Sequence, residues 1–365
     1  MTPDIAVTFT GLTFPNPFLL SSAPPTESDT NIMRAFDAGW GGVVTKTIGL
    51  HPVTNVAGPK TKFLRTTIDG HLSMQKKPDT ALHSSWNWEL ISDKTLDWWV
   101  PKIEGIKKAH PDRILIASIM AGSGSDTELA HWQTLAKACQ DAGADAFELN
   151  LSCPHMDRTD MGSNIGRDQA QVSIVTAVVK EVAKIPVWCK LTPSTTDIVD
   201  EASAAFRGGA DAIVSSNTFP SLPLIDPETM DFEMNVDGLV SSGGLGGPAI
   251  LPQSLAKMAS LAGAFPDRAF SGIGGVAEFA HALNYFLLGC GTVQVCTAAM
   301  LDRAIGPTVI KALIDGMGQF MEKRGYARLD DFRGLRRGNV VMHSKIRRPD
   351  GKDYHGGYDA EGYAS

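Results

Sequence analysis

Short apolar runs alternate with longer amphipathic stretches along almost the whole chain. The short runs are rich in Val, Ile, Leu and Ala and have the length of buried strands. They lie at residues 19–22, 42–48, 114–120, 146–151, 187–191, 212–216, 269–273 and 292–296. We therefore predict eight strands that are buried on both faces, as parallel strands are.

Helix signals occupy the intervals between these strands. A polar cap or a terminal glycine marks a helix from Ser28 to Gly39, one from Ser92-Asp93 to His110, and two that end at Gly143 and at Gly208-Gly209. The stretches AFDAGWGGVV, CQDAGADAFEL, FRGGADAIV and LLGCGTVQV repeat the passage from helix through glycine to strand. Eight such units predict an α/β fold, the (β/α)8 TIM barrel. A doubly wound sheet also alternates, but it rarely needs eight units.

Three segments lie outside this repeat. IAVTFTGLTFPNPF, near the N-terminus, predicts a β-hairpin that closes one end of the barrel. Residues 49–89 and 218–238 are long insertions, which we expect over the C-terminal face, where barrels bind their ligands. We expect one barrel domain over residues 1–325 and a C-terminal extension over 326–365 that packs on the barrel or on a partner subunit.

The composition narrows the class of protein. A net charge of -7 argues against binding of nucleic acid, and no apolar stretch is long enough to predict a membrane span. The five cysteines are scattered without a C-x-x-C pair, which argues against disulfides, structural zinc and an iron–sulfur cluster. We expect a cytoplasmic protein without a metal site.

Candidate chemistry lies where the predicted strands end. SSGGLGGPAI, SGIGG and QVCTA bring glycine-rich turns and the last strand ends to one sector of the barrel. Backbone N–H groups at such turns suit a phosphate, either of a substrate or of a cofactor, although glycines also serve tight turns alone.

Lys46 and Lys190 each end an apolar strand, so each ammonium should need an anionic partner. Three alternatives stay open for them: a Schiff-base lysine, a side chain that reaches out of the barrel rim, and a charge that stabilises an anionic reduced flavin.

Carboxamides form the other polar group. Asn87, Asn150 and Asn217 each combine a donor with an acceptor and match the edge of a flat ring such as a pyrimidine. Asn150 and Asn217 follow strand patterns, in which Asn is otherwise disfavoured. Asn87, in HSSWNWEL, fits a turn equally well.

A family resemblance then emerges from motifs that occur in order: RAFDAGWGGVVTKT, WNWELISDK, GADAFELNLSCPH, KLTPSTTDI, SSNTF, GGLGGPAI, GIGGV and QVCTA. Residues 12–300 resemble the flavin-binding, pyrimidine-reducing barrel of dihydropyrimidine dehydrogenases, within the class 1 dihydroorotate dehydrogenase-like superfamily. The resemblance implies FMN, held by Ser21, Ser22, Lys46, Asn150, Lys190, Thr218, Gly247, Gly274, Gly275, Cys296 and Thr297. It implies pyrimidine contacts at Asn87, Glu89, Asn150, Asn217 and Thr218, and catalytic roles for Cys153, Lys46 and Lys190.

The resemblance makes Cys153, in ELNLSCPH, the general acid/base. Reduction of a pyrimidine C5=C6 bond needs a hydride, from FMN N5, and a proton from an acid on the opposite face. A thiol with an ordinary pKa of about 8.5 is mostly protonated at neutral pH and can donate. On the residues alone, Cys153 could equally be a small buried side chain. We expect His155 to orient a mobile loop that bears Cys153, with direct catalysis by His155 as the alternative.

Departures from the family shape the remaining expectations. WNWEL and His155 stand where dihydroorotate dehydrogenases have Asn-Ser-Met-Gly-Leu and Asn, so we expect uracil or thymine rather than orotate. No cysteine follows Cys296, so we expect either that a separate NAD(P)H- or ferredoxin-linked reductase subunit supplies the electrons or that the substrate pair differs. The resemblance also implies a homodimer. Two rival functions are dihydroorotate dehydrogenase and a non-catalytic FMN- or phosphate-binding assembly subunit.

Overall fold

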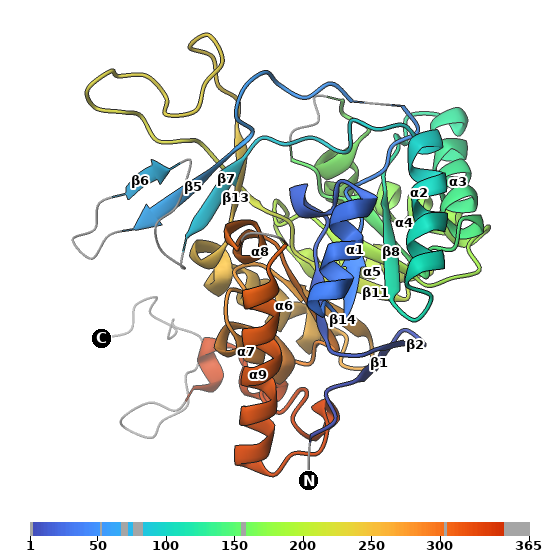
Figure 1. Ribbon diagram of the computed structural model, residues 1–365, viewed down its shortest axis with the longest axis vertical. Helices are drawn as coiled ribbons and strands as arrows, with labels where there is room; N and C mark the ends of the chain where they lie inside the picture. Colours follow the sequence, from blue (N-terminus) through green and yellow to red (C-terminus); the bar gives the residue numbers. More distant parts are fainter. Residues whose placement is uncertain are drawn as a thin grey trace, which may run out of the picture.

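A closed barrel of eight parallel strands forms the centre of the computed structural model, which describes residues 3–51, 53–66, 72–75, 83–154, 158–302 and 305–346 (Figure 1). Around the barrel lie β3 (Phe18–Leu20), β4 (Gly42–Val44), β8 (Ile114–Ile119), β9 (Ala146–Leu151), β10 (Val187–Leu191), β11 (Ala212–Ser215), β14 (Ala269–Ile273) and β15 (Thr292–Val295). The last strand, β15, pairs with the first, β3, and closes the barrel. The eight predicted strands and the (β/α)8 fold are therefore confirmed.

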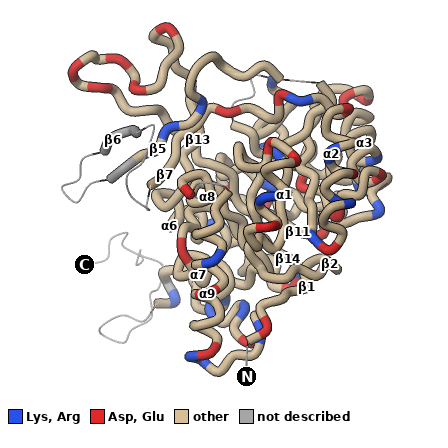
Figure 2. Tube along the Cα trace, viewed as in Figure 1, with Lys and Arg blue, Asp and Glu red and all other residues tan. Residues whose placement is uncertain are grey.

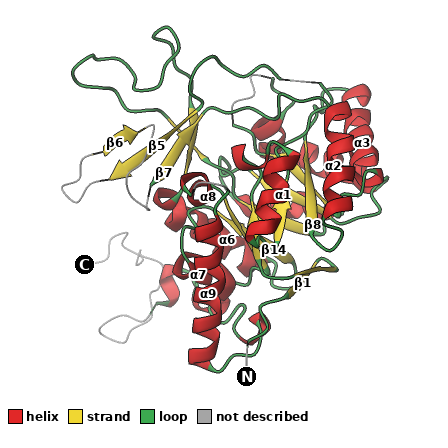
Figure 3. Ribbon diagram, viewed as in Figure 1, coloured by secondary structure: helices red, strands yellow, loops and turns green. Residues whose placement is uncertain are grey.

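Helices surround the barrel (Figure 3). They are α1 (Asp29–Ala38), α2 (Leu96–Ala109), α3 (Asp126–Asp141), α4 (Gln169–Lys180), α5 (Ile198–Arg207), α6 (Leu251–Ala264), α7 (Phe279–Leu288) and α9 (Pro307–Arg324), with the short α8 (Thr297–Leu301) directly after β15. Ser28 caps α1 by accepting a hydrogen bond from the Asn31 N–H, and Gly39, at φ 106°, ends it as predicted.

The predicted start of α2 at Ser92 is wrong by one turn. Thr95 is the N-cap, and its hydroxyl accepts from the Trp98 N–H. The Ser92 hydroxyl instead accepts from the Trp99 indole Nε1 at 3.0 Å. The Ser92 side chain, which the sequence pattern assigned to the N-cap of α2, is thus used in a tertiary contact with the buried Trp99.

The N-terminal hairpin closes the barrel at the end where the strands begin. It consists of β1 (Val7–Phe9) and β2 (Leu12–Phe14), which pair antiparallel as predicted. Phe9 packs edge-on against Trp188, with ring centroids 5.1 Å apart, and the Trp188 indole N–H donates to the Thr10 hydroxyl at 3.0 Å. Trp188 is fully buried at the start of β10, so the hairpin seals this end with aromatic side chains.

A second sheet lies over the opposite end of the barrel; we call it the cap sheet (Figure 3). Its strand order is β12 (Phe219–Ser221), β13 (Gly243–Gly246), β7 (Ser84–Asn87), β5 (Thr61–Thr66) and β6 (Leu72–Gln75). The insertion after β4 supplies β5, β6 and β7, and the insertion after β11 supplies β12 and β13. Trp86, which lies on β7, forms a small core of its own with Trp88 and Met234. The two long insertions were expected at this face, but their pairing into one sheet was not predicted.

The chain returns to the barrel after α9. Phe332 is fully buried and packs against Phe286, and the Gly334 N–H donates to the Phe286 carbonyl. The division of the chain at residue 325 stays a prediction, and residues 347–365 lie outside the described residues.

Charged residues of both signs are interspersed along the helices, whereas the charged residues of the excursion between β12 and β13 are all acidic (Figure 2). Within the described ranges, the structure contains no helix of the length and apolarity that crossing a bilayer requires.

Candidate active site

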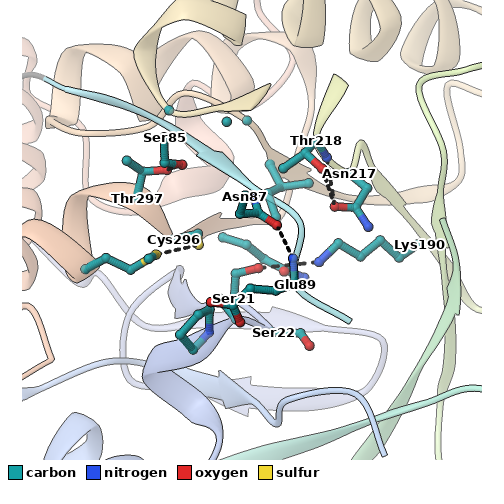
Figure 4. A pocket seen from close by; sticks show the side chains of 18 of the residues that line it. Ser21, Ser22, Ser85, Asn87, Glu89, Lys190, Asn217, Thr218, Cys296 and Thr297 are labelled. Atoms are coloured by element: carbon teal, nitrogen blue, oxygen red, sulfur yellow. Dashed lines mark hydrogen bonds between the residues drawn. The ribbon is translucent and has the colours of Figure 1, made fainter. Parts of the chain in front are cut away.

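The C-terminal ends of the barrel strands and the cap sheet enclose a pocket of about 1030 Å³, part of it open to solvent (Figure 4). The predicted FMN-binding, pyrimidine-binding and catalytic residues all line this pocket: Ser21, Ser22, Lys46, Asn87, Glu89, Asn150, Cys153, Lys190, Asn217, Thr218, Gly247, Gly274, Gly275, Cys296 and Thr297. Their individual roles stay predictions.

Lys46 forms a buried ion pair with Glu89. Its Nζ lies 2.7 Å from Glu89 Oε2, and the two side chains are 8% and 14% exposed. The other carboxylate oxygen, Oε1, accepts from the hydroxyl of Thr61 on β5 at 3.1 Å. The anionic partner expected for this lysine is therefore supplied by the insertion after β4, and the pair joins the barrel to that insertion.

Lys190 has its partner inside the barrel. Its Nζ lies 3.3 Å from Glu148 Oε1 and 3.4 Å from the Ser21 hydroxyl. Glu148 Oε2 accepts from Gln294 Nε2 at 2.7 Å. Since Lys46 and Lys190 are both buried, the alternative in which a lysine reaches out of the barrel rim is wrong for both.

A chain of hydrogen bonds links the two barrel carboxamides. Asn150 donates to the Thr47 hydroxyl at 2.9 Å, and its Oδ1 accepts from both the hydroxyl and the N–H of Ser152. Asn217 donates to the Ser152 hydroxyl at 2.8 Å and to the Ser152 carbonyl at 3.2 Å. Asn150 therefore keeps at most one N–H for a ligand, and both carboxamides fix Ser152, the residue before Cys153.

Asn87 lies at the end of strand β7 and not in a turn, so the turn alternative is wrong. Its Nδ2 donates to the Gly244 carbonyl at 3.3 Å, and its Oδ1 accepts from the Glu89 N–H at 3.3 Å (Figure 4). Thr218 stands against Gly244, where an added Cβ would lie 2.2 Å from the Thr218 hydroxyl. The cap sheet thus sets Asn87 and Thr218 in the pocket wall.

Three glycines of the pocket have backbone conformations that other residues rarely adopt. Gly247, Gly274 and Gly275 have φ angles of 81°, 120° and 80°. A Cβ on Gly274 would lie 2.2 Å from the Ser254 hydroxyl, and one on Gly275 would lie 2.5 Å from Leu251 Cβ. The pocket therefore needs glycine here for both conformation and space. Gly243 and Gly244 differ, because they lie within β13 and serve packing in the cap sheet.

Hydroxyls and a thiol complete the wall around β15 and β3. The Ser85 and Thr297 hydroxyls lie 2.8 Å apart and connect the cap sheet to α8 (Figure 4). Ser22 lies 3.3 Å from the Thr47 hydroxyl. Burial raises the pKa of the Cys296 thiol to about 11, and it outweighs the opposing effect of the charge on Lys190.

Cys153 lines the pocket directly after the hydrogen-bonded Ser152 and is 4% exposed. The Ser163 N–H donates to the Cys153 carbonyl at 3.0 Å, which ties the returning loop to this residue. Further along, Arg158 binds Asp160 and Glu128, and Asp160 accepts from the Gly124 N–H. The loop base is thus held on both sides. His155 lies outside the described residues, and its predicted role stays untested.

Similarity to known proteins assigns this chain to a family. The model of the family described as "Dihydroorotate dehydrogenase" matches residues 87–321, more than half of the chain. The chain belongs to this family. It is 38% identical over 341 residues to the chloroplastic dihydropyrimidine dehydrogenase (NADP(+)) of Arabidopsis thaliana. This alignment covers 91% of the present chain and 76% of the plant protein.

Two further members have names that place them in multi-subunit enzymes. The NAD-dependent dihydropyrimidine dehydrogenase subunit PreA of Escherichia coli (strain K12) is 34% identical over 95% of this chain and 80% of its own length. The dihydroorotate dehydrogenase B (NAD(+)) catalytic subunit of Methanosarcina mazei is 32% identical over 90% of this chain and 94% of its own. The predicted relationship is confirmed, and the chain is an oxidoreductase of the dihydropyrimidine and dihydroorotate dehydrogenase type.

Sequence reasoning missed three residues that organise the site. Glu148 lies on β9 two residues before Asn150, and Gln294 lies on β15 two residues before Cys296, so both share a strand face with a predicted site residue. A charged side chain inside an apolar strand was the signal available for Glu148. Thr61 offered no signal, because its contact with Glu89 depends on the fold of the insertion after β4.

Proposed function

We propose that this pocket binds FMN and a pyrimidine ring, and that the protein reduces or oxidises the C5–C6 bond of a pyrimidine such as uracil or thymine. The observation that carries the proposal is the meeting, in one pocket, of a buried thiol, two buried lysines and three glycines of positive φ. Family membership supports the reaction class.

The residues present fit a flavin mononucleotide. Gly247, Gly274 and Gly275 line the pocket without side chains and at positive φ, which suits close approach of a phosphate to the backbone. Among the described residues, the buried Gln294 Oε1 and Ser216 Oγ have no hydrogen-bond partner, and both residues line the pocket. Such orphaned groups need a polar ligand. Ser21, Lys46 and Lys190 would hold the ring, because a cation compensates the charge that the ring gains on reduction.

When bound, FMN supplies the atom that gives or takes the hydride. Cys153 supplies the proton to the pyrimidine, or removes it in the opposite direction, as a positioned acid or base worth about 10²–10⁴ in rate. Ser152, held by Asn150 and Asn217, fixes where Cys153 leaves the strand.

Glu89 is the residue that favours a neutral ring over orotate. Both of its oxygens are held, by Lys46 and by Thr61, so its carboxylate stays in the pocket wall. An N–H of uracil can donate to its remaining lone pairs. The carboxylate of orotate would face a like charge; at about 5 Å and an effective dielectric constant of about 20, the repulsion is about 3 kcal/mol, which Lys46 offsets in part.

The electron partner is also part of the proposal. Two relatives carry the word "subunit" in their names together with NAD or NAD(+), which supports a separate partner subunit. We place an NAD(P)H- or ferredoxin-linked reductase in that role, and a homodimer in the cytoplasm as its setting.

The test uses the purified full chain under anaerobic conditions. We expect a yellow protein whose flavin, once reduced with dithionite, is reoxidised by uracil or thymine and slowly by orotate. Faster reoxidation by orotate identifies dihydroorotate dehydrogenase instead. A colourless protein that takes up no FMN supports the non-catalytic barrel and refutes the proposal.

A further inference from the structure

Glu148 is a carboxylate in a place where barrels usually carry branched apolar side chains. It is fully buried in β9, below the pocket, and the proposed reaction gives it no task. An ionised carboxylate in such a position is costly unless it is paired and hydrogen-bonded. The role of Glu148 can therefore be inferred from the residues that it contacts.

Both oxygens of Glu148 are engaged by other barrel strands: β10, which pairs with β9, and β15, which lies across the barrel from it. Lys190, on β10, lies 3.3 Å from Oε1, and Gln294, on β15, donates to Oε2 at 2.7 Å. The Gln294 amide nitrogen donates to Glu148, and its oxygen, Oε1, has no hydrogen-bond partner among the described residues. Gln294 Oε1 is therefore available to accept a hydrogen bond from a ligand. Glu148 orients both neighbours at once, and both line the pocket.

Lys190 depends on this arrangement. Its side chain is 5% exposed, and its ammonium is held between Glu148 and the Ser21 hydroxyl. Without a counter-charge, the desolvation cost of the buried ammonium is uncompensated, and Lys190 loses the contact that holds it at the pocket. A displaced Lys190 could not stabilise the charge that a flavin gains on reduction.

We propose that Glu148 is a positioning residue that holds the Lys190 ammonium in the pocket beside the cofactor, and that it sets the reduction potential of the flavin through that lysine. The inference rests on the proposed binding of FMN. It concerns a residue that touches neither cofactor nor substrate, so its test must separate an effect through Lys190 from simple support of the fold.

The test is a double-mutant cycle on the full chain with Glu148→Gln, Lys190→Met and the pair combined. The surface pair Lys311–Asp315 on α9 supplies the control variant Asp315→Asn. FMN binding by the wild-type chain is measured first. The midpoint potential of the bound flavin and the thermal unfolding of the apoprotein are then measured for each variant.

We expect Glu148→Gln to shift the midpoint potential to more negative values, as Lys190→Met does. The ratio of reduced- to oxidised-flavin affinity should fall roughly ten- to hundredfold, the range for a hydrogen bond to a charged group. In the Lys190→Met background Glu148→Gln should have no further effect on the potential. The apoprotein with both changes should unfold at a higher temperature than either single variant, because neither buried partner is left alone.

Three results overturn the inference: equal effects of Glu148→Gln with and without Lys190, a shift to more positive potential, or a loss of thermal stability with an unchanged potential. A wild-type chain that binds no FMN instead refutes the proposed function, and this role with it. The thermal cycle of the apoprotein would then still report the ion pair by itself.

Discussion

Replacement of Glu89 by Gln removes one partner of the buried ion pair with Lys46 and keeps the shape of the side chain. The pair is 2.7 Å long, and its side chains are 8% and 14% exposed, so little water is available to solvate the remaining ammonium. Loss of one partner from such a pair costs about 3–5 kcal/mol. An unfolding entropy of about 2.1 cal/mol/K per residue, over 365 residues, converts this loss to a fall in Tm of roughly 4–6 °C.

The same substitution should change the choice of substrate. Without the carboxylate, the repulsion of about 3 kcal/mol that we infer for orotate is removed, and Lys46 becomes available to the orotate carboxylate. We expect the ratio of orotate to uracil affinity to rise about tenfold or more. Ligand titrations that follow the flavin absorbance give this ratio, and differential scanning calorimetry gives the Tm.

Glu104, exposed on α2, provides the matched control Glu104→Gln, which should leave both quantities unchanged. If Glu89→Gln leaves the Tm within 1 °C or so of the wild type and the affinity ratio unaltered, Glu89 is neither a structural partner of Lys46 nor a selectivity determinant.

The remaining predictions concern two side chains of the site and the buried thiols. Thr61→Val removes the hydroxyl that donates to Glu89 Oε1 and should raise the KM for uracil about tenfold, whereas Thr61→Ser keeps the hydroxyl and should leave the KM near the wild-type value. Equal KM values for the two variants in steady-state kinetics would refute this role of Thr61. Cys153→Ser should oxidise dihydrouracil slowly near neutral pH and recover in part at high pH, and a flat pH profile of kcat/KM would contradict a base role. Burial raises the pKa of the Cys139 and Cys189 thiols to about 12, whereas a thiol in the unfolded chain has a pKa of about 8.5. The free energy of unfolding should therefore be unaffected by these thiols below about pH 8.5 and should fall as the pH rises from there toward 12. Urea unfolding at pH 8 and pH 10 checks this, and Cys139→Ala should flatten the dependence.

Much of the barrel is readable from the sequence because its signals are local. Each strand is a compact apolar run, and caps such as Ser28 and Gly39 act within one turn of their helix. The start of α2 was misplaced because Ser92 has the composition of a cap, while its contact with Trp99 depends on tertiary structure.

The cap sheet could not be predicted for the same reason. Its strands are three to six residues long, and β7 pairs with β13 across more than 150 positions of sequence. GGLG reads as a loop, yet Gly243 is required in β13 because a Cβ would lie 2.2 Å from the Trp86 ring. Short strands of this kind gain their stability from partners that lie far away in the chain.

The site residues differ in the same way: some have local sequence signals, and others depend on contacts distant in sequence. Residues at strand ends, such as Lys46 and Cys153, could be found because barrels place their chemistry there. The ion-pair partners of the lysines could not be assigned, since Glu148 lies one layer deeper in the barrel and Glu89 reaches the pocket through an insertion. Which charge faces which lysine depends on the fold as a whole.

The most direct measurement is a single-turnover experiment with the reduced flavoprotein and uracil, recorded for the wild type and for Cys153→Ala by stopped-flow absorbance at the flavin band. We expect both proteins to bind FMN and uracil to reoxidise the wild-type flavin. Reoxidation in the variant should be at least about a hundredfold slower, because the proton donor is missing. Reoxidation at the same rate in both proteins would show that Cys153 does not deliver the proton.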